Sequence, residues 1–180
     1  ARMESESLRL TLMDTPGHVD FSTEAERVLP VLDCAVLVIS GTDGVQSHTV
    51  TLWKLLEKYS VPTFLFINKM DLPGTEKEAL LEKLQSQLSD RCVDFTAEEE
   101  SIAESCAMCD EALLETYLES GEVTPGNIRG LIEKRKVFPC CFGSALKLRG
   151  VERLLEVLDG YAPRPVYPEA FGAKVYKISR

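Results

Sequence analysis

Apolar positions along the chain fall into short runs of two kinds, which alternate. Some runs are continuously apolar or apolar at every second position, and these predict β-strands at residues 8–12, 35–39, 64–67 and 137–142. Longer stretches with apolar residues at helical spacing predict helices at residues 22–32, 47–59, 75–88 and 151–158. Pro30 is expected to end or kink the first of these helices. The alternation predicts an open, mostly parallel α/β sheet covered by helices.

Two stretches depart from this alternation. Residues 90–136 contain the helix-capping sequence Thr-Ala-Glu-Glu and a Thr-Pro pair typical of a helix start. We therefore expect two or three small inserted helices there, with no chemistry of their own. Residues 171–178 have the pattern of a further strand. We expect one domain over residues 1–166 and the start of a second within residues 167–180.

The composition is that of a soluble globular protein, with 44% hydrophobic and 27% charged residues. The net charge of −9 argues against an independent binder of nucleic acid or of a membrane surface. No apolar run approaches the roughly 20 residues that span a bilayer. The first residues lack the character of a signal peptide. We therefore expect a cytoplasmic protein.

Six cysteines are present, and two of them, Cys106 and Cys109, have the spacing of a redox or zinc-knuckle pair. A second Cys or His pair does not follow nearby, and the two cysteines lie in an acidic, helix-like stretch. We favour the interpretation that they are reduced thiols on a helix. A metal or redox role is the alternative.

The strongest candidate for chemistry is Asn68-Lys69-Met70-Asp71, which follows the predicted strand at residues 64–67. A carboxylate can accept hydrogen bonds from two neighbouring N–H donors, which guanine offers on one edge and adenine does not. Asn68 could brace the loop or the base, and the stem of Lys69 could lie along the ring. Because Asn-Lys-x-Asp is short and occurs by chance, this interpretation depends on two further loops.

The upstream loop, Asp-Thr-Pro-Gly-His at positions 14–18, follows the first predicted strand. Beside a triphosphate, Asp14 could hold Mg²⁺ through water, and the N–H of Gly17 could bond the terminal phosphate. His18 could orient an attacking water. Taken alone, the loop could equally be a Pro-Gly turn with a solvated histidine.

The downstream loop, Gly-Ser-Ala-Leu-Lys at positions 143–147, follows the last predicted strand. Its backbone N–H groups, chiefly that of Ala145, could donate to the carbonyl oxygen of guanine. The alternative is an ordinary strand-to-helix turn. Open parallel sheets bind ligands outside the carboxyl ends of their strands, so we expect all three loops at one edge, where they would form a purine pocket.

These three loops match the nucleotide loops of translational GTPases. Residues 14–21, 32–33 and 44–46 resemble the elongation factor G branch. Residues 39–46 and the compact insertion look closer to ribosomal-protection tetracycline-resistance proteins of the TetM/TetO type. The resemblance covers residues 8–180. It implies a P-loop-NTPase-type sheet followed by a β-barrel domain that begins near residue 167.

The resemblance implies a GTP-binding, ribosome-dependent GTPase of protein biosynthesis, with Mg²⁺ as cofactor. In the TetM/TetO type the GTPase cycle dislodges the drug, which would mean antibiotic resistance. The resemblance implies that His18 is the catalytic position and that Asp14 contacts the metal through water. The nucleotide contacts that it implies are Asp14, Gly17, Asn68, Lys69, Asp71, Ser144 and Ala145.

One part of the family pattern, the phosphate-binding sequence Gly-x-x-x-x-Gly-Lys-Ser/Thr, does not occur, since no glycine here is followed by lysine. On this comparison the first strand and its P-loop are missing. We therefore expect a partial GTP-binding domain that alone binds GTP weakly or not at all and does not hydrolyse it. An unpaired sheet edge is expected to promote self-association. The alternatives are a catalytically dead GTPase-fold binding module and a GTPase unrelated to translation.

Overall fold

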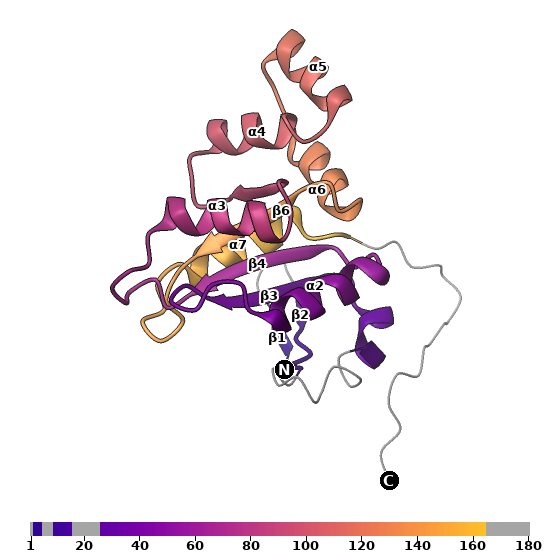
Figure 1. Ribbon diagram of the computed structural model, residues 1–180. Helices are drawn as coiled ribbons and strands as arrows, with labels where there is room; N and C mark the ends of the chain where they lie inside the picture. The colour runs from indigo at the N-terminus through magenta and orange to yellow at the C-terminus, as the bar shows by residue number, and fades with distance from the viewer. Residues whose placement is uncertain (1, 5–8, 16–25, 165–180) are drawn as a thin grey trace, which may run out of the picture.

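The computed structural model describes residues 2–4, 9–15 and 26–164, and Figure 1 shows an α/β arrangement. The main sheet has four strands, all parallel, in the order β3-β4-β6-β5. These strands are β3 (Ala35–Ser40), β4 (Thr63–Asn68), β5 (Cys92–Asp94) and β6 (Phe138–Phe142). The α/β class with a mostly parallel sheet, expected from the alternation of patterns, is confirmed.

Strand β4 is central and is buried at five of its six positions. Its alternate residues divide between two cores, as expected for a strand covered on both faces. Phe64 and Phe66 belong to one core, and Leu65 and Ile67 belong to the other. Strand β3 pairs with β4 along its whole length, so that Ser40 and Asn68 end the two strands side by side.

Pro139 lies inside β6, where a residue without an N–H would normally interrupt the ladder. The N–H of Phe138 donates to Arg91, and the carbonyl of Cys140 accepts from Phe95, so the neighbours of Pro139 bond toward β5. Pro139 therefore faces β4, and the pairing of β4 with β6 begins one residue later. The proline thus removes no hydrogen bond that this sheet makes.

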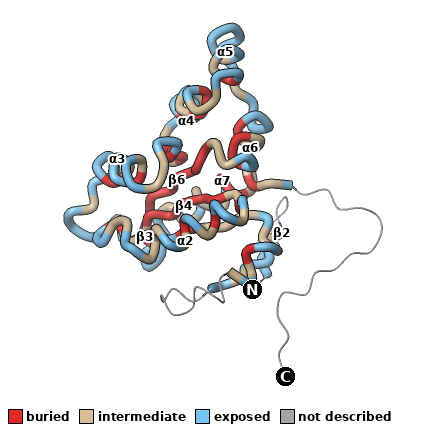
Figure 2. Tube along the Cα trace, turned by 45° about the vertical axis from the view of Figure 1, so that its right-hand side comes forward, coloured by how far each residue is buried: buried red, intermediate tan, exposed pale blue. Residues whose placement is uncertain are grey.

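Helices cover both faces of the main sheet, and the buried strands run through the middle of the molecule (Figures 1 and 2). Helices α2 (Ser47–Lys58) and α3 (Lys77–Gln87) pack on the face of Leu65 and Ile67. Helix α7 (Val151–Tyr161) packs on the face of Phe64 and Phe66, together with helices of the insertion. The helices predicted at residues 47–59, 75–88 and 151–158 are confirmed, with bounds that differ by three residues at most.

The insertion at residues 90–136 forms three helices and one strand of the main sheet. The helices are α4 (Glu99–Ala107), α5 (Glu111–Ser120) and α6 (Pro125–Glu133), so the expected number of helices is confirmed. The sequence did not predict strand β5, which has three residues and pairs with Phe138–Cys140 of β6. An ion pair of 2.6 Å between Lys77 and Asp94 joins the insertion to α3, and one of 2.5 Å between Lys136 and Asp110 lies within the insertion.

The strand predicted at residues 8–12 is present as β2 (Arg9–Thr11), but it does not lie in the main sheet. It pairs antiparallel with β1 (Arg2–Glu4) in a separate two-stranded sheet. The expectation that it joins the parallel strands is therefore wrong for the described residues. Strand β2 has exposed residues on either side of a half-buried Leu10, whereas β4 and β6 are buried on both faces.

The helix predicted over residues 22–32 is described from residue 26 onward. The chain is helical to residue 28 and then forms a 3₁₀ turn, η2 (Leu29–Val31), which contains Pro30. The predicted end of the helix at Pro30 is confirmed. The strand predicted at residues 171–178 lies outside the described residues. Within the described ranges, no helix combines the length and the apolar character needed to cross a membrane.

Candidate functional site

The loops that follow β4 and β6 lie against each other at the carboxyl edge of the main sheet. The N–H of Met70 donates to the carbonyl of Gly143 at 3.0 Å, and the N–H of Gly143 donates to the carbonyl of Ile67 at 2.9 Å. Gly41, directly after β3, donates to the carbonyl of Asn68 at 2.7 Å. Backbone hydrogen bonds therefore hold three neighbouring strand ends together.

The side chain of Asn68 ties the first two of these loops. Its Oδ1 accepts hydrogen bonds from the backbone N–H of Ala145, at 2.9 Å, and from that of Lys69, at 2.8 Å. Of the two roles that the sequence left open for Asn68, these contacts support bracing the loop. Lys69 has a φ of 66°, a left-handed conformation that costs a non-glycine residue about 1–3 kcal/mol. The bonds to Asn68 thus stabilise a strained turn.

The N–H of Ala145, which the sequence assigned to the base carbonyl, already has this partner. The next two bonded donors of the turn are the N–H of Lys147, to Ser144, and the N–H of Leu148, to Ala145, both at 3.2 Å. Between Ala145 and Lys147, the N–H of Leu146 has no hydrogen-bond partner in the part of the chain that the structure describes. Leu146 is therefore the free donor of this turn. Its sequence position alone gave no signal of this.

Two glycines allow the turn after β6 to close tightly. A Cβ on Gly143 would lie 2.3 Å from the carbonyl oxygen of Arg149, and a Cβ on Gly150 would lie 2.4 Å from that of Phe142. Gly150 also has a φ of 74°, which favours glycine. Ser144 and Arg149 exchange backbone hydrogen bonds across the turn at 2.9 and 3.0 Å. Any side chain at these glycines would displace the backbone.

The Asp71 carboxylate lies between the same two loops. Its side chain is 12% exposed, and Oδ2 lies 3.0 Å from Nζ of Lys147, whose side chain is 49% exposed. Hydrogen bonds from the hydroxyl of Ser144 and from Lys147 lower the pKa of Asp71 to about 2, although partial burial opposes this. Ser144 itself is 2% exposed. Asp71 is therefore ionised at any pH above about 3.

The upstream loop is described only in part. Asp14 and Thr15 are exposed, and no hydrogen bond or ion pair joins Asp14 to the other two loops in the described residues. Gly17 and His18 lie outside the described residues. The structure thus brings together five of the eight predicted site residues: Asn68, Lys69, Asp71, Ser144 and Ala145.

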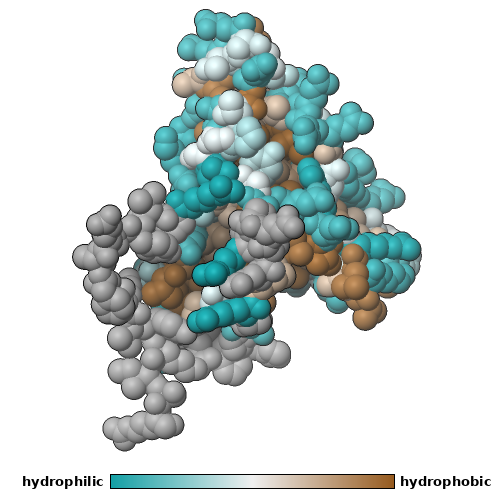
Figure 3. All heavy atoms as spheres, turned by 180° about the vertical axis from the view of Figure 1, so that it is seen from behind, coloured by the Kyte–Doolittle hydropathy of each residue, from teal (hydrophilic) through white to brown (hydrophobic). Residues whose placement is uncertain are grey.

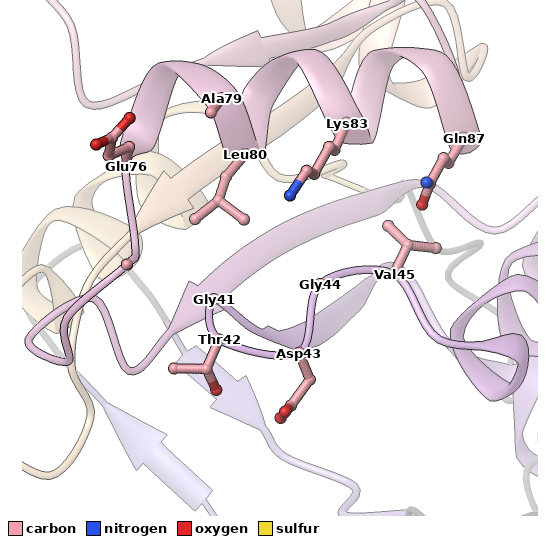
Figure 4. A pocket seen from close by; sticks show the side chains of 11 residues that line it. Gly41, Thr42, Asp43, Gly44, Val45, Glu76, Ala79, Leu80, Lys83 and Gln87 are labelled. Carbon is pink, nitrogen blue, oxygen red and sulfur yellow. The ribbon is translucent and has the colours of Figure 1, made fainter.

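A cavity of about 260 Å³ adjoins the site on the side of β3, between the loop at residues 41–45 and α3 (Figure 4). The side chains of Lys83 and Gln87 point from α3 toward this loop, and Glu76 lies at the other end of the helix. The sequence did not predict this cavity, because its polar residues are spread over two segments without a recognisable motif. The cavity is open to solvent, and its lining carries both acidic and basic side chains.

The cysteine pair lies on α4 and just after it, outside the loops of the candidate site. Burial raises the pKa of the Cys106 thiol to about 12 and also raises the pKa of Cys109, so both thiols are protonated at neutral pH. In the described part of the chain, no three His, Cys, Asp or Glu side chains lie close enough to hold a metal ion. The magnesium contact expected of Asp14 stays a prediction.

Comparison with known proteins gives the same family as the loops. Residues 1–164 match the elongation factor Tu GTP-binding domain family. Elongation factor G 1 of Geobacter sulfurreducens is 30% identical over 217 residues, with 92% of this chain and 32% of that protein aligned. A crystal structure of a Thermus thermophilus protein has a TM-score of 0.78 at 25% identity, over 91% of this chain and 31% of that one.

This chain spans about a third of the length of both relatives. The family match includes both loops that converge on Asp71 and the strands that deliver them. The chain therefore belongs to the elongation factor Tu GTP-binding domain family.

Proposed function

We propose that this chain recognises the guanine base of GTP in a ribosome-dependent, elongation-factor-G-like GTPase. The observation that supports this most is the Asp71 carboxylate, which is ionised and lies between two loops that Asn68 joins. A carboxylate held in this way selects a base that presents two adjacent N–H donors. Guanine presents such a pair, and adenine does not.

In this proposal each loop residue has one task at the base. Asp71 accepts from the ring N–H and the exocyclic amino group of guanine. The free N–H of Leu146 donates to the base carbonyl, and the N–H of Ala145 joins it when Asn68 releases that bond. The stem of Lys69 lies along the ring. The buried hydroxyl of Ser144 donates a hydrogen bond to the Asp71 carboxylate.

The phosphate end of the nucleotide is assigned to the loop at positions 14–18. We assign to Asp14 a water-mediated hold on Mg²⁺, which neutralises phosphate charge when it is bound. The N–H of Gly17 would bond the terminal phosphate, and His18 would orient the attacking water. These assignments rest on the resemblance of the loop to those of translational GTPases.

The charge distribution bears on how the chain would sit on a ribosome. Residues 92–128 contain ten acidic and no basic residues, whereas the rest of the chain contains 19 acidic and 20 basic residues. Figure 3 shows mainly hydrophilic side chains at the outer end of the molecule, where α5 lies. Because RNA phosphates repel such a surface, we propose that the insertion points away from ribosomal RNA. A factor of this kind would act in the cytoplasm.

Ribosomal protection against tetracycline is a finer proposal within the same function. It is supported by the sequence at residues 39–46 and by the compact insertion of three short helices. The protein that carries this chain would restore translation that tetracycline has inhibited. If translation were not restored, the elongation role would remain and the protection role would be excluded.

For these 180 residues alone we propose weak GTP binding, since the sequence offers no Gly-Lys-Ser/Thr cradle for the phosphates. Micromolar binding of a fluorescent GTP analogue would contradict this. We also propose self-association through an edge of the sheet, since β3 pairs only with β4 among the described residues. A molar mass of one chain, measured by light scattering, would contradict self-association.

A base-exchange experiment tests the proposed function. Asp71→Asn replaces two acceptor positions by an amide that also donates, so xanthine should replace guanine as the preferred base. Binding of GDP and XDP at millimolar concentration is measured by NMR in both forms of the chain. A preference for guanine that survives Asp71→Asn would contradict the proposal.

A further inference from the structure

The ion pair between Asp71 and Lys147 joins the two loops of the base site at their side chains. It spans 3.0 Å from Oδ2 to Nζ, and the two residues come from the loops after β4 and β6. Asp71 is the residue to which the proposed function assigns recognition of the base. The proposed function gives Lys147 no role at the base.

This contact is one of three that the Asp71 carboxylate makes with the protein. An ionised carboxylate offers about four lone-pair positions on its two oxygens. It accepts from the hydroxyl of Ser144, from the ammonium of Lys147 and from the backbone N–H of Asp71 itself. The carboxylate that would receive the two N–H donors of guanine is therefore already oriented by groups of the protein.

Lys147 is also well placed to fix the rotation of this carboxylate. Its own N–H donates to Ser144 at 3.2 Å, within a turn closed by the bonds between Ser144 and Arg149. The neighbouring apolar side chains do not anchor the turn, because Leu146 and Leu148 are 92% and 75% exposed. Among the described residues, the side chains that reach from this turn to Asp71 are those of Ser144 and Lys147.

We propose that Lys147 is a positioning residue of the base site, which holds the Asp71 carboxylate in the orientation that faces the base. This inference rests on the proposed function. Lys147 does not touch the base in this arrangement; it acts through Asp71. The opposite possibility is that the ammonium occupies the place of a base donor and competes with it.

The first test needs no nucleotide. The pKa of Asp71 is measured by carboxyl NMR in the wild-type chain, in Lys147→Met and in Lys147→Arg. Ser144 and Lys147 both lower the pKa of Asp71, so loss of Lys147 should raise that pKa above about 2 while the Ser144 bond still holds it below the ordinary value; arginine should keep it low. An unchanged pKa in Lys147→Met would overturn the inference, because the contact would then not exist in solution.

The second test separates positioning from competition. Millimolar GDP and IDP are titrated at pH 7; IDP keeps the ring N–H but lacks the exocyclic amino group. Lys147→Met should lower the affinity for GDP by about tenfold and bring the ratio of GDP affinity to IDP affinity close to one. Lys147→Arg should restore the GDP affinity and the ratio. The control is Lys134→Met, which changes an exposed lysine just after α6 and should alter neither quantity.

The outcomes distinguish this inference from the proposed function. Unchanged or higher GDP affinity in Lys147→Met, together with a large loss in Asp71→Asn, would overturn the role of Lys147 and leave the base site intact. GDP affinity that responds to neither substitution would contradict the base site itself.

Discussion

Asn68 and Ala145 lie 77 residues apart in the chain, and a hydrogen bond of 2.9 Å joins the side-chain oxygen of the first to the backbone N–H of the second. The bond crosses from the end of β4 to the turn after β6. It holds the loop that carries Asp71 against the turn that carries Ser144 and Lys147. A short polar side chain at a strand end thus sets the spacing of the candidate base site.

Asn68→Ala should separate these two loops. The substitution leaves the N–H groups of Ala145 and Lys69 without their acceptor, so the free energy of unfolding should fall by about 1–2 kcal/mol. Asn68→Asp keeps an acceptor oxygen and should cost less. Urea unfolding followed by the fluorescence of Trp53, the one tryptophan, measures both. Equal stability of the wild type and Asn68→Ala would show that the bond does not form.

Gly143→Ala should be among the most damaging single-methyl changes in the chain. The added Cβ would lie 2.3 Å from the carbonyl oxygen of Arg149, and backbone cannot yield as a flexible side chain can. We expect a loss of about 2–3 kcal/mol or failure to fold, measured by the same urea unfolding.

The matched control is Gly130→Ala in α6, where an added Cβ meets nothing within 4 Å. Alanine favours the helix, so this variant should gain up to about 1 kcal/mol. A similar effect of the two substitutions would contradict the tight closure of the turn after β6.

Arg135 should stabilise the end of the sheet that lies opposite the candidate site. It does so through the planar contacts of its guanidinium as well as through its charge. Its guanidinium donates to Val61 and, at 2.7 Å, to Thr63, and it lies 5.2 Å from the ring of Trp53 and 5.0 Å from that of Phe138. Arg135→Lys keeps the charge but loses the planar contact, so we expect a cost of about 1–2 kcal/mol. The emission of Trp53 should also shift. Unaltered emission and stability would contradict this packing.

Stability should fall in acid partly through Asp71 and Asp110. Both have a pKa below the ordinary value, Asp71 mainly through Ser144 and Lys147, and Asp110 mainly through Lys136. A lowered pKa in the folded state stabilises the fold above the unfolded value of about 3.9, and this contribution is lost as the pH falls through the folded value. The melting temperature should therefore be level from pH 7 to about 5 and then decline. Asp71→Asn should make that decline shallower; an identical pH profile would refute the assignment.

The sequence predicted those parts of the fold in which burial alone decides the pattern. Strands β3, β4 and β6 are continuous apolar runs, and the stripes of α2, α3 and α7 match the faces that they cover. Strand β5 was missed because three residues carry too little pattern, and its pairing with β6 stabilises it instead. Strand β2 was identified, but a local pattern does not specify a pairing partner.

For the candidate site, the sequence identified the two loops but not how their groups pair. It assigned the N–H of Ala145 to a ligand, whereas Asn68 accepts it in the structure. Nor did it identify Lys147 as the partner of Asp71, since residues so far apart in the chain show no local signal. Such pairings depend on the register of β4 with β6, which only the assembled sheet defines.

The most direct test of the central claim is to locate the guanine base on the chain. Millimolar GDP is added to ¹⁵N-labelled protein, and the backbone N–H shifts are compared with those caused by ADP. We predict that GDP, but not ADP, shifts the N–H signals of Met70, Asp71 and Leu146, which line the junction of the two loops. Equal shifts with ADP, or shifts confined to the cavity beside Lys83 and Gln87, would contradict guanine recognition at this edge of the sheet.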